Sequence, residues 1–172
     1  MLPEFAIFGP SDKHSVIKGG FCISVFAIVK RDSKVLLVKP KENPRWKEEW
    51  SPNWRLYEPE HLANEFDSWR FPSSYVREGE APEETLRRLL KEQLVIQQYS
   101  IVSNEFYNFY EPSRRYPDKM HWDYCFVYYV KLNETPTPKP WFSAVEFVDS
   151  KTLSLQDFGS AQGWLAKALK LI

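Results

Sequence analysis

Cysteine, glycine and long apolar runs are all scarce in this 172-residue chain, which has 2 Cys and 6 Gly. Cys22 and Cys125 lie far apart in apolar segments, without CxxC spacing or the His/Cys clustering of a zinc site, so we expect two buried free thiols. No apolar run approaches the roughly 18 to 20 residues that span a bilayer, and the amino terminus lacks a signal-peptide pattern. These features predict a soluble, unsecreted, cytoplasmic protein without a membrane partner.

A charge excess of either sign is also missing. Lys plus Arg and Asp plus Glu each total 23, so the formal net charge is zero and a nucleic-acid partner is not indicated. Motifs for a P-loop, for dinucleotide binding and for a serine nucleophile elbow are absent as well. The chain does have 43% hydrophobic and 16% aromatic residues, enough for a packed core at a length that suits one domain. We therefore expect a single domain over residues 1–172.

Periodic patterns predict several strands. Residues 22–30 and 35–39 are rich in β-branched and aromatic side chains and indicate a hairpin with a four-residue connection at 31–34. Residues 99–110 and 122–132 indicate a pair of long antiparallel strands.

The remaining segments complete a mixed pattern. Residues 144–148 predict a short strand, and residues 159–171 predict a final amphipathic helix. Residues 40–68 combine prolines, tryptophans and many charges, which predicts a long, partly ordered insertion. Strands and helices thus interleave irregularly, and this order favours a mixed sheet with helices packed on its faces.

The strongest helix signal covers residues 82–94. Pro82 suits the first helical position, and Glu83 and Glu84 suit the positive end of the helix dipole. Leucines recur at every fourth position and predict a stripe that faces the core: Leu86, Leu90 and Leu94.

The segment from Phe71 to Ile96, FPSSYVREGEAPEETLRRLLKEQLVI, resembles the signature box of the Nudix hydrolase family. In that family the box reads Gly, five residues, Glu, seven residues, then Arg-Glu-apolar-x-Glu-Glu-x-Gly-apolar. The match places the first glutamate on Glu80, the arginine on Arg88 and one of the paired glutamates on Glu92. The box at residues 74–96 is degenerate, because four positions differ from the family's Gly, Glu, Glu and Gly: Ser74, Leu89, Gln93 and Val95. The resemblance implies an α/β fold, a Nudix-like α/β/α sandwich with a mixed β-sheet flanked by helices.

In the Nudix family, three glutamates on one helix flank bind divalent ions, usually Mg²⁺, which polarise a bound diphosphate while water attacks phosphorus. At about 100° per residue, positions 89, 92 and 93 share such a flank, which we expect to face outward. Leu89 cannot bind a cation, and the Gln93 amide is a weaker ligand than a carboxylate. Glu92 is therefore the candidate metal ligand and catalytic residue, with Mg²⁺ or Mn²⁺ as cofactor. Five carboxylates elsewhere are candidates to replace the missing ligands: Glu78, Glu105, Glu111, Asp118 and Asp123.

The resemblance gives Glu80 and Arg88 a structural role, because this pair would fix the loop that precedes the helix. The residues alone leave a second pairing open, since Glu84 and Arg88 are four positions apart on the helix. Val95 replaces the box's closing glycine, which predicts that the helix does not end in the usual left-handed cap.

Several residues outside the box are candidates for ligand binding. Trp46 and Trp50, interleaved with basic residues, could stack on a nucleobase, although pinning the insertion to the core is the favoured reading. Arg114 could bind phosphate or remain a solvated loop charge. His121, close to Asp123, could act as a base or ligand, but a lone histidine at a strand start is more often structural.

The sequence leaves two functions open. The first is a metal-dependent, Nudix-type pyrophosphohydrolase of a nucleoside diphosphate derivative, with a depleted metal site and weak activity. The second is a non-catalytic Nudix-fold module that binds a nucleotide, a protein or a ribonucleoprotein. Leu89 motivates the second, because an apolar residue suits ligand packing or a partner interface better than a dication. The expected partner is a nucleotide-type small molecule, with a protein partner left open, and the sequence does not decide whether the chain is an enzyme.

Overall fold

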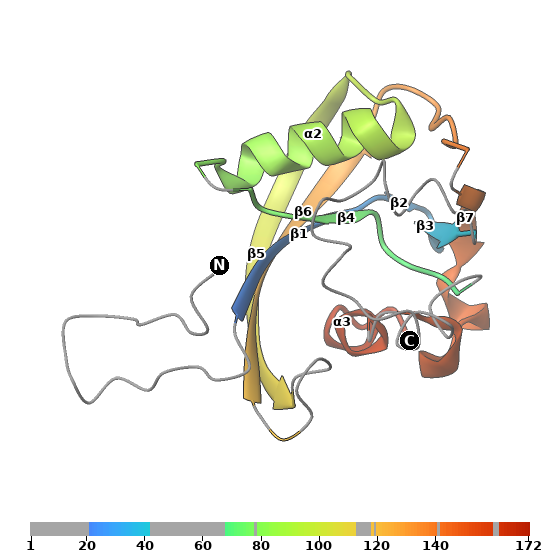
Figure 1. Cartoon of the computed structure of the whole chain (residues 1–172). Helices are drawn as coiled ribbons and strands as arrows, with labels where there is room; N and C mark the ends of the chain where they lie inside the picture. The colour runs from blue at the N-terminus through green and yellow to red at the C-terminus, as the bar shows by residue number, and fades with distance from the viewer. Residues whose placement is uncertain are drawn as a thin grey trace.

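The computed structural model describes residues 21–41, 68–77, 79–112, 118, 120–140, 142–159 and 162–172. Figure 1 shows strands lying between helix α2 (Pro82–Leu94) and helix α3 (Gly163–Ala168). Most of the predicted insertion, residues 42–67, lies outside the described residues. The fold is therefore built from the segments before and after it.

The larger sheet contains four strands: β1 (Phe21–Ile28), β4 (Ser73–Tyr75), β5 (Tyr99–Pro112) and β6 (Met120–Leu132). Their order across the sheet is β4-β1-β6-β5. β1 pairs with β6 in parallel and with β4 antiparallel, so the sheet is mixed, as predicted. β5 pairs antiparallel with β6, which confirms the predicted pair of long strands.

The smaller sheet contains three strands in the order β2-β3-β7: β2 (Lys30–Arg31), β3 (Lys34–Pro40) and β7 (Phe142–Asp149). β7 confirms the strand predicted at residues 144–148. The predicted hairpin is wrong in its connection, because β1 and β3 lie in different sheets and the hairpin joins β2 to β3. Its turn needs only Asp32 and Ser33, since Asp32 adopts a φ of 56°, a left-handed conformation that aspartate tolerates better than most residues.

Two hydrophobic clusters cover opposite faces of the larger sheet, because neighbouring residues of a strand point to opposite sides. On β1, Val25 belongs to the cluster that contains α2 residues, and Phe26 belongs to the cluster that contains α3 residues. The α2 cluster includes the three leucines predicted to face the core: Leu86, Leu90 and Leu94. The layers therefore follow the order helix, sheet, helix.

The carboxyl-terminal helix is shorter than predicted. α3 covers six residues instead of the stretch 159–171, and Lys170, at a φ of 53°, lies outside helical geometry. Between β7 and α3, the described residues form two single-turn 3₁₀ helices: η3 (Ser150–Thr152) and η4 (Leu155–Asp157). Within the described ranges, no helix has the length and apolar character needed to cross a membrane.

Candidate functional site

The amino-terminal end of α2 forms as the sequence predicts. Pro82 occupies the first helical position, and Glu83 and Glu84 lie in the first turn. The Glu84 carboxylate accepts a hydrogen bond from the backbone N–H of Ala81 at 2.8 Å, which satisfies one of the donors left open at a helix start. Glu84 is therefore engaged at the helix start, and the alternative pairing with Arg88 is not the arrangement observed.

The structure contains the expected pair of Glu80 and Arg88. Arg88 Nε donates to Glu80 Oε1 and Nη2 donates to Oε2, both at 2.7 Å, so the contact is bidentate. Thr85 Oγ1 and the Arg77 backbone N–H also donate to Glu80, at 2.6 and 3.1 Å. The carboxylate thus fixes the loop between β4 and α2.

These hydrogen bonds change the acidity of Glu80. Chiefly through the Arg88 guanidinium, and despite an opposing effect of burial, they lower the pKa of Glu80 from 4.5 to about 2. The same contact with Glu80 raises the pKa of Arg88 above its ordinary value. Both side chains therefore stay charged across the physiological pH range.

Arg88 also ties the helix to β4. Its Nη1 donates to Ser74 Oγ at 3.0 Å, and its Nη2 donates to the Tyr75 carbonyl at 2.8 Å. Ser74 occupies the box position of the family's glycine, and its hydroxyl supplies a contact that glycine lacks. Structural hydrogen bonds thus use four of the five N–H donors of the Arg88 guanidinium.

Leu89 does not face outward, contrary to the prediction for this flank. Its side chain is 1% exposed and belongs to the hydrophobic cluster between α2 and the sheet. Burial of a leucine side chain stabilises a fold by about 1.5–3 kcal/mol, which explains why this position turns inward with its neighbour Leu90. A position that carries a metal-binding glutamate in the family is part of the core in this chain.

Gln93 is also buried, at 3% exposure, so a second position of the predicted flank is closed to solvent. Its Nε2 donates a hydrogen bond of 2.7 Å to the backbone carbonyl of Ser73 on β4. A carboxylate at this position would have no proton to donate. The amide is therefore suited to joining α2 to β4.

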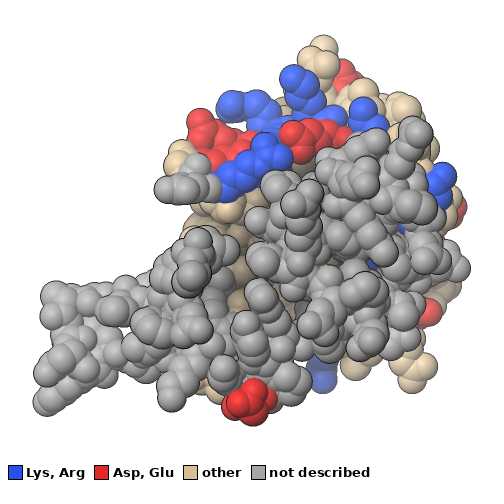
Figure 2. All heavy atoms as spheres, viewed as in Figure 1, with Lys and Arg blue, Asp and Glu red and all other residues tan. Residues whose placement is uncertain are grey.

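Glu92 alone of the three positions remains accessible, with 47% of its side chain exposed. Its Oε2 lies 3.8 Å from Arg77 Nη2 and 3.8 Å from Arg88 Nη1. Figure 2 shows basic and acidic side chains interspersed over this part of the molecule. The remaining carboxylate therefore lies between two guanidinium groups.

The described candidates for replacement ligands do not restore the lost charges. Glu105 accepts hydrogen bonds from Tyr107 at 2.6 Å and Tyr129 at 3.3 Å, and the first of these raises the pKa of Tyr107 to about 12. Tyr107 and Tyr129 pack against the α3 cluster, so Glu105 lies on the sheet face opposite α2.

Asp123 and Cys125 are two residues apart on β6, so their side chains point to the same face of the sheet. Cys125 belongs to the α3 cluster, and Asp123 is therefore directed away from α2. Asp118 is exposed in a turn. The side chains of Glu78 and Glu111 lie outside the described residues.

The α2 flank does not fit a divalent cation held as in the family. Leu89 offers no ligand atom, Gln93 is engaged by its amide nitrogen, and Glu92 is flanked by two positive charges. A hard dication such as Mg²⁺ prefers carboxylate oxygens, and nearby cations oppose its binding electrostatically. The three positions of this flank therefore do not supply the carboxylate ligands of the family's metal centre.

The three predicted substrate-binding residues, Trp46, Trp50 and Arg114, lie outside the described residues. The structure instead displays an aromatic surface that sequence reasoning missed. Ring centroids of neighbouring members lie 5.1 to 6.0 Å apart, and two members are largely exposed, Phe106 at 49% and Tyr110 at 59%. This aromatic surface consists of Phe106, Tyr110, Trp122, Tyr124 and Phe126.

The aromatic surface lies on the α2 side of the sheet. Its members occupy alternate positions of β5 and β6, and Phe126 packs against the cluster that contains α2 residues. The alternation of aromatic residues at 122, 124 and 126 was visible in the sequence as a period of two. The pairing of this row with Phe106 and Tyr110 depends on the strand register.

Three solved structures illustrate the relationship to known proteins. The MutT NUDIX hydrolase of Burkholderia pseudomallei is 16% identical with a TM-score of 0.57, over 88% of this chain and 98% of its own. The NUDIX domain of Shewanella oneidensis NrtR, complexed with ADP ribose, is 16% identical with a TM-score of 0.53, over 87% and 84%.

The third is a bifunctional NMN adenylyltransferase/ADP ribose pyrophosphatase of Francisella tularensis, complexed with AMP and a manganese ion. It is 14% identical with a TM-score of 0.53, over 87% of this chain and 41% of its own. No curated protein is similar enough in sequence to match.

These likenesses show the fold, and they confirm the predicted Nudix-like α/β/α sandwich with a mixed sheet. The family model of the NUDIX domain matches the sequence over residues 20–170, which is nearly the whole chain. The Glu80 and Arg88 pair, the helix after it and the layered sheets occupy the places that the resemblance assigned to them. This chain therefore belongs to the NUDIX domain family.

Proposed function

We propose that this protein is a binding module for a nucleotide-type ligand, a nucleoside diphosphate derivative such as ADP-ribose, and that it does not hydrolyse this ligand efficiently. The observation that carries the proposal is the loss of metal ligands from the α2 flank, which consists of positions 89, 92 and 93. Leu89 and Gln93 are buried at 1% and 3% exposure, and Glu92 lies between Arg77 and Arg88. Nudix hydrolysis depends on divalent cations at these positions, and losing their ligands costs orders of magnitude in rate.

The aromatic surface supports nucleotide binding. Base stacking on an aromatic side chain contributes about 1–3 kcal/mol, and Phe106 and Tyr110 expose roughly half of their area beside other rings. Arg77, with 57% of its side chain exposed, is the cation that we assign to the ligand's phosphates. Trp46, Trp50 and Arg114 remain proposed as further contacts, and a cytoplasmic location is part of the same proposal. The ADP ribose bound by the NUDIX domain of NrtR makes this compound the first probe.

The second candidate is the hydrolase itself, and the exposure of Glu92 favours it. This carboxylate is 47% exposed, and its two guanidinium contacts of 3.8 Å are longer than a hydrogen bond. In this alternative, Glu92 is the metal ligand and catalytic residue of a weak pyrophosphohydrolase that uses Mg²⁺ or Mn²⁺.

Calorimetric titration of the full chain with ADP-ribose, combined with chromatography of the products, separates the two functions. We expect saturable binding without metal and no AMP release after addition of Mg²⁺ or Mn²⁺. Phe106→Ala should weaken binding about 10-fold, because a stacking contact is lost. Val102→Ala, an exposed position on the same strand, is the matched control and should bind like the parent chain.

Glu92→Gln decides the enzymatic alternative. Metal-dependent AMP release that disappears in this variant would establish the hydrolase and contradict the proposal. Absence of binding to ADP-ribose and to a panel of other nucleoside diphosphate compounds would contradict it as well.

A further inference from the structure

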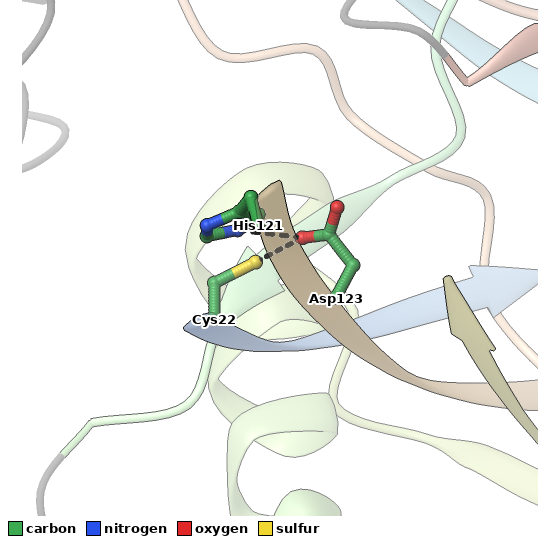
Figure 3. A group of neighbouring side chains, drawn as sticks. All are labelled: Cys22, His121 and Asp123. Atoms are coloured by element: carbon green, nitrogen blue, oxygen red, sulfur yellow. Dashed lines mark hydrogen bonds and ion pairs between the residues drawn. The ribbon is translucent and has the colours of Figure 1, made fainter. Parts of the chain in front are cut away.

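Cys22, His121 and Asp123 converge at one place on the larger sheet (Figure 3). Cys22 lies near the start of β1, and His121 and Asp123 lie near the start of β6. The prediction of two buried free thiols is therefore confirmed for Cys125 and wrong for Cys22, which is only half-buried. The sequence could not show the cluster because Cys22 and Asp123 are 101 positions apart.

The sheet itself brings the three side chains together. β1 and β6 run in parallel with Cys22 directly opposite Asp123, and His121 lies two residues before Asp123, on the same face of the strand. The three side chains point to the same face of the sheet as Phe26 on β1 and Cys125 on β6. The cluster therefore lies on the α3 side of the sheet, opposite the α2 flank. A site formed by paired strands is held in place before any ligand arrives.

The arrangement is convergent. The Cys22 thiol donates a hydrogen bond to Asp123 Oδ1, and His121 Nε2 lies 3.3 Å from the same oxygen. One ligand atom from each residue lies within 4.8 Å of the others. Metal–ligand bonds of about 2.0–2.2 Å at tetrahedral angles place two ligand atoms about 3.3–3.5 Å apart, which matches the separation of the histidine nitrogen and the carboxylate oxygen.

We propose that Cys22, His121 and Asp123 form a binding site for a zinc-class divalent transition-metal ion, independent of the nucleotide function proposed above. Thiolate sulfur, imidazole nitrogen and carboxylate oxygen are the three ligand types that zinc takes in proteins. Three protein ligands leave one tetrahedral position for water. A cysteine nucleophile is not the better reading, because the thiol donates its hydrogen bond to the Asp123 carboxylate.

Partial burial also favours a cation here. The side chains of His121 and Asp123 are 23% and 18% exposed, so the ligands are sheltered while an ion can still enter. In the described part of the chain, this is the group of three Cys, His, Asp or Glu side chains that meets the geometry of a metal site. A bound ion would join the first residues of β1 and β6.

Cobalt substitution tests the site directly. Co²⁺ added to chelator-treated full-length protein should produce visible ligand-field bands and a thiolate-to-cobalt charge-transfer band at one equivalent, and Zn²⁺ should displace them. Because the thiol must lose its proton, binding should release protons and strengthen as the pH rises. Absence of a charge-transfer band in the parent protein with excess Co²⁺ would overturn the proposal without reference to any variant.

Matched variants assign the ligands. Cys22→Ser should abolish the charge-transfer band, and Cys125→Ser, which removes the other thiol, should keep it. His121→Asn and Asp123→Asn should each weaken Zn²⁺ binding at least about 10-fold, and Asp118→Asn should not, with circular dichroism confirming the fold of each. Zinc binding that is equal in Cys22→Ser and the parent chain would overturn the proposal.

Discussion

At the residue scale, Gln93 shows how a one-atom difference redirects a side chain. Glutamine and glutamate have the same shape, but only the amide can donate the 2.7 Å hydrogen bond to the Ser73 carbonyl. A position that carries a metal-binding glutamate in the family thus joins the helix to β4 in this chain. Leu89 completes the change by joining the core, with 1% exposure.

Gln93→Glu should lower the free energy of unfolding at neutral pH by about 1–3 kcal/mol, because a buried carboxylate would face a carbonyl without a hydrogen to share. Urea denaturation measures the change. Gln156→Glu, at an exposed position, is the matched control and should change stability little. A Gln93→Glu variant as stable as the control would show that the hydrogen bond is not structural.

The lowered pKa of Glu80 predicts how the free energy of unfolding changes at acid pH. Its pKa in the folded protein is lowered to about 2, so its stabilising contribution is complete above about pH 4.5 and is lost as the pH falls toward 2. Glu80→Gln should cost about 2 kcal/mol at pH 7 and flatten the stability curve between pH 4.5 and 2. Thermal unfolding across this range checks the expectation. Glu84→Gln, which keeps an acceptor for Ala81, should preserve the steep acid limb, and an equally steep limb in Glu80→Gln would contradict the assignment.

At the element scale, the end of α2 corrects the prediction made from Val95. This residue adopts a left-handed conformation, with φ of 60° and ψ of 31°, and its N–H donates to the Leu90 carbonyl. The helix therefore ends in the left-handed cap that usually carries glycine, although the residue is β-branched. The positive φ of Val95 therefore destabilises the end of the helix. Because the residue is 42% exposed, burial of its side chain compensates little for this cost.

Val95→Gly should raise the free energy of unfolding by about 1 kcal/mol, because glycine adopts positive φ without a steric penalty. Guanidinium denaturation provides the measurement. Val102→Gly, at an exposed position in β5, should instead lower stability by a similar amount, since glycine weakens strands. If both substitutions destabilise the protein equally, Val95 is not strained.

The elements were predictable where local chemistry determines them. α2 could be predicted from Pro82, its acidic first turn and its leucine stripe, and the strand pair β5 and β6 from composition. The split between β1 and β3 could not, because a continuous apolar stretch does not show where a chain changes sheets. Leu89 faces inward because it packs against the sheet. The family pattern, which has a metal-binding glutamate at this position, instead led to the prediction of an outward-facing side chain.

At the scale of the whole molecule, the larger sheet separates two groups of candidate functional residues, which lie on its opposite faces. Its α2 side carries the aromatic surface and the altered box, and its α3 side carries Cys22, His121 and Asp123. Sequence could not place the second group, because the parallel pairing of β1 with β6 joins distant segments. The family and its layered fold were recoverable from residues 71–96, and the geometry of the binding residues was not.

The most direct test of the central claim is Mn²⁺ binding, measured by electron paramagnetic resonance of the free ion. The comparison uses Cys22→Ser protein, which removes the other cation site, with and without Glu92→Gln. We predict the same free Mn²⁺ signal for both proteins, with or without ADP-ribose, because α2 holds one carboxylate between two arginines. Uptake of Mn²⁺ by the Cys22→Ser protein that is lost when Glu92→Gln is added would contradict the account.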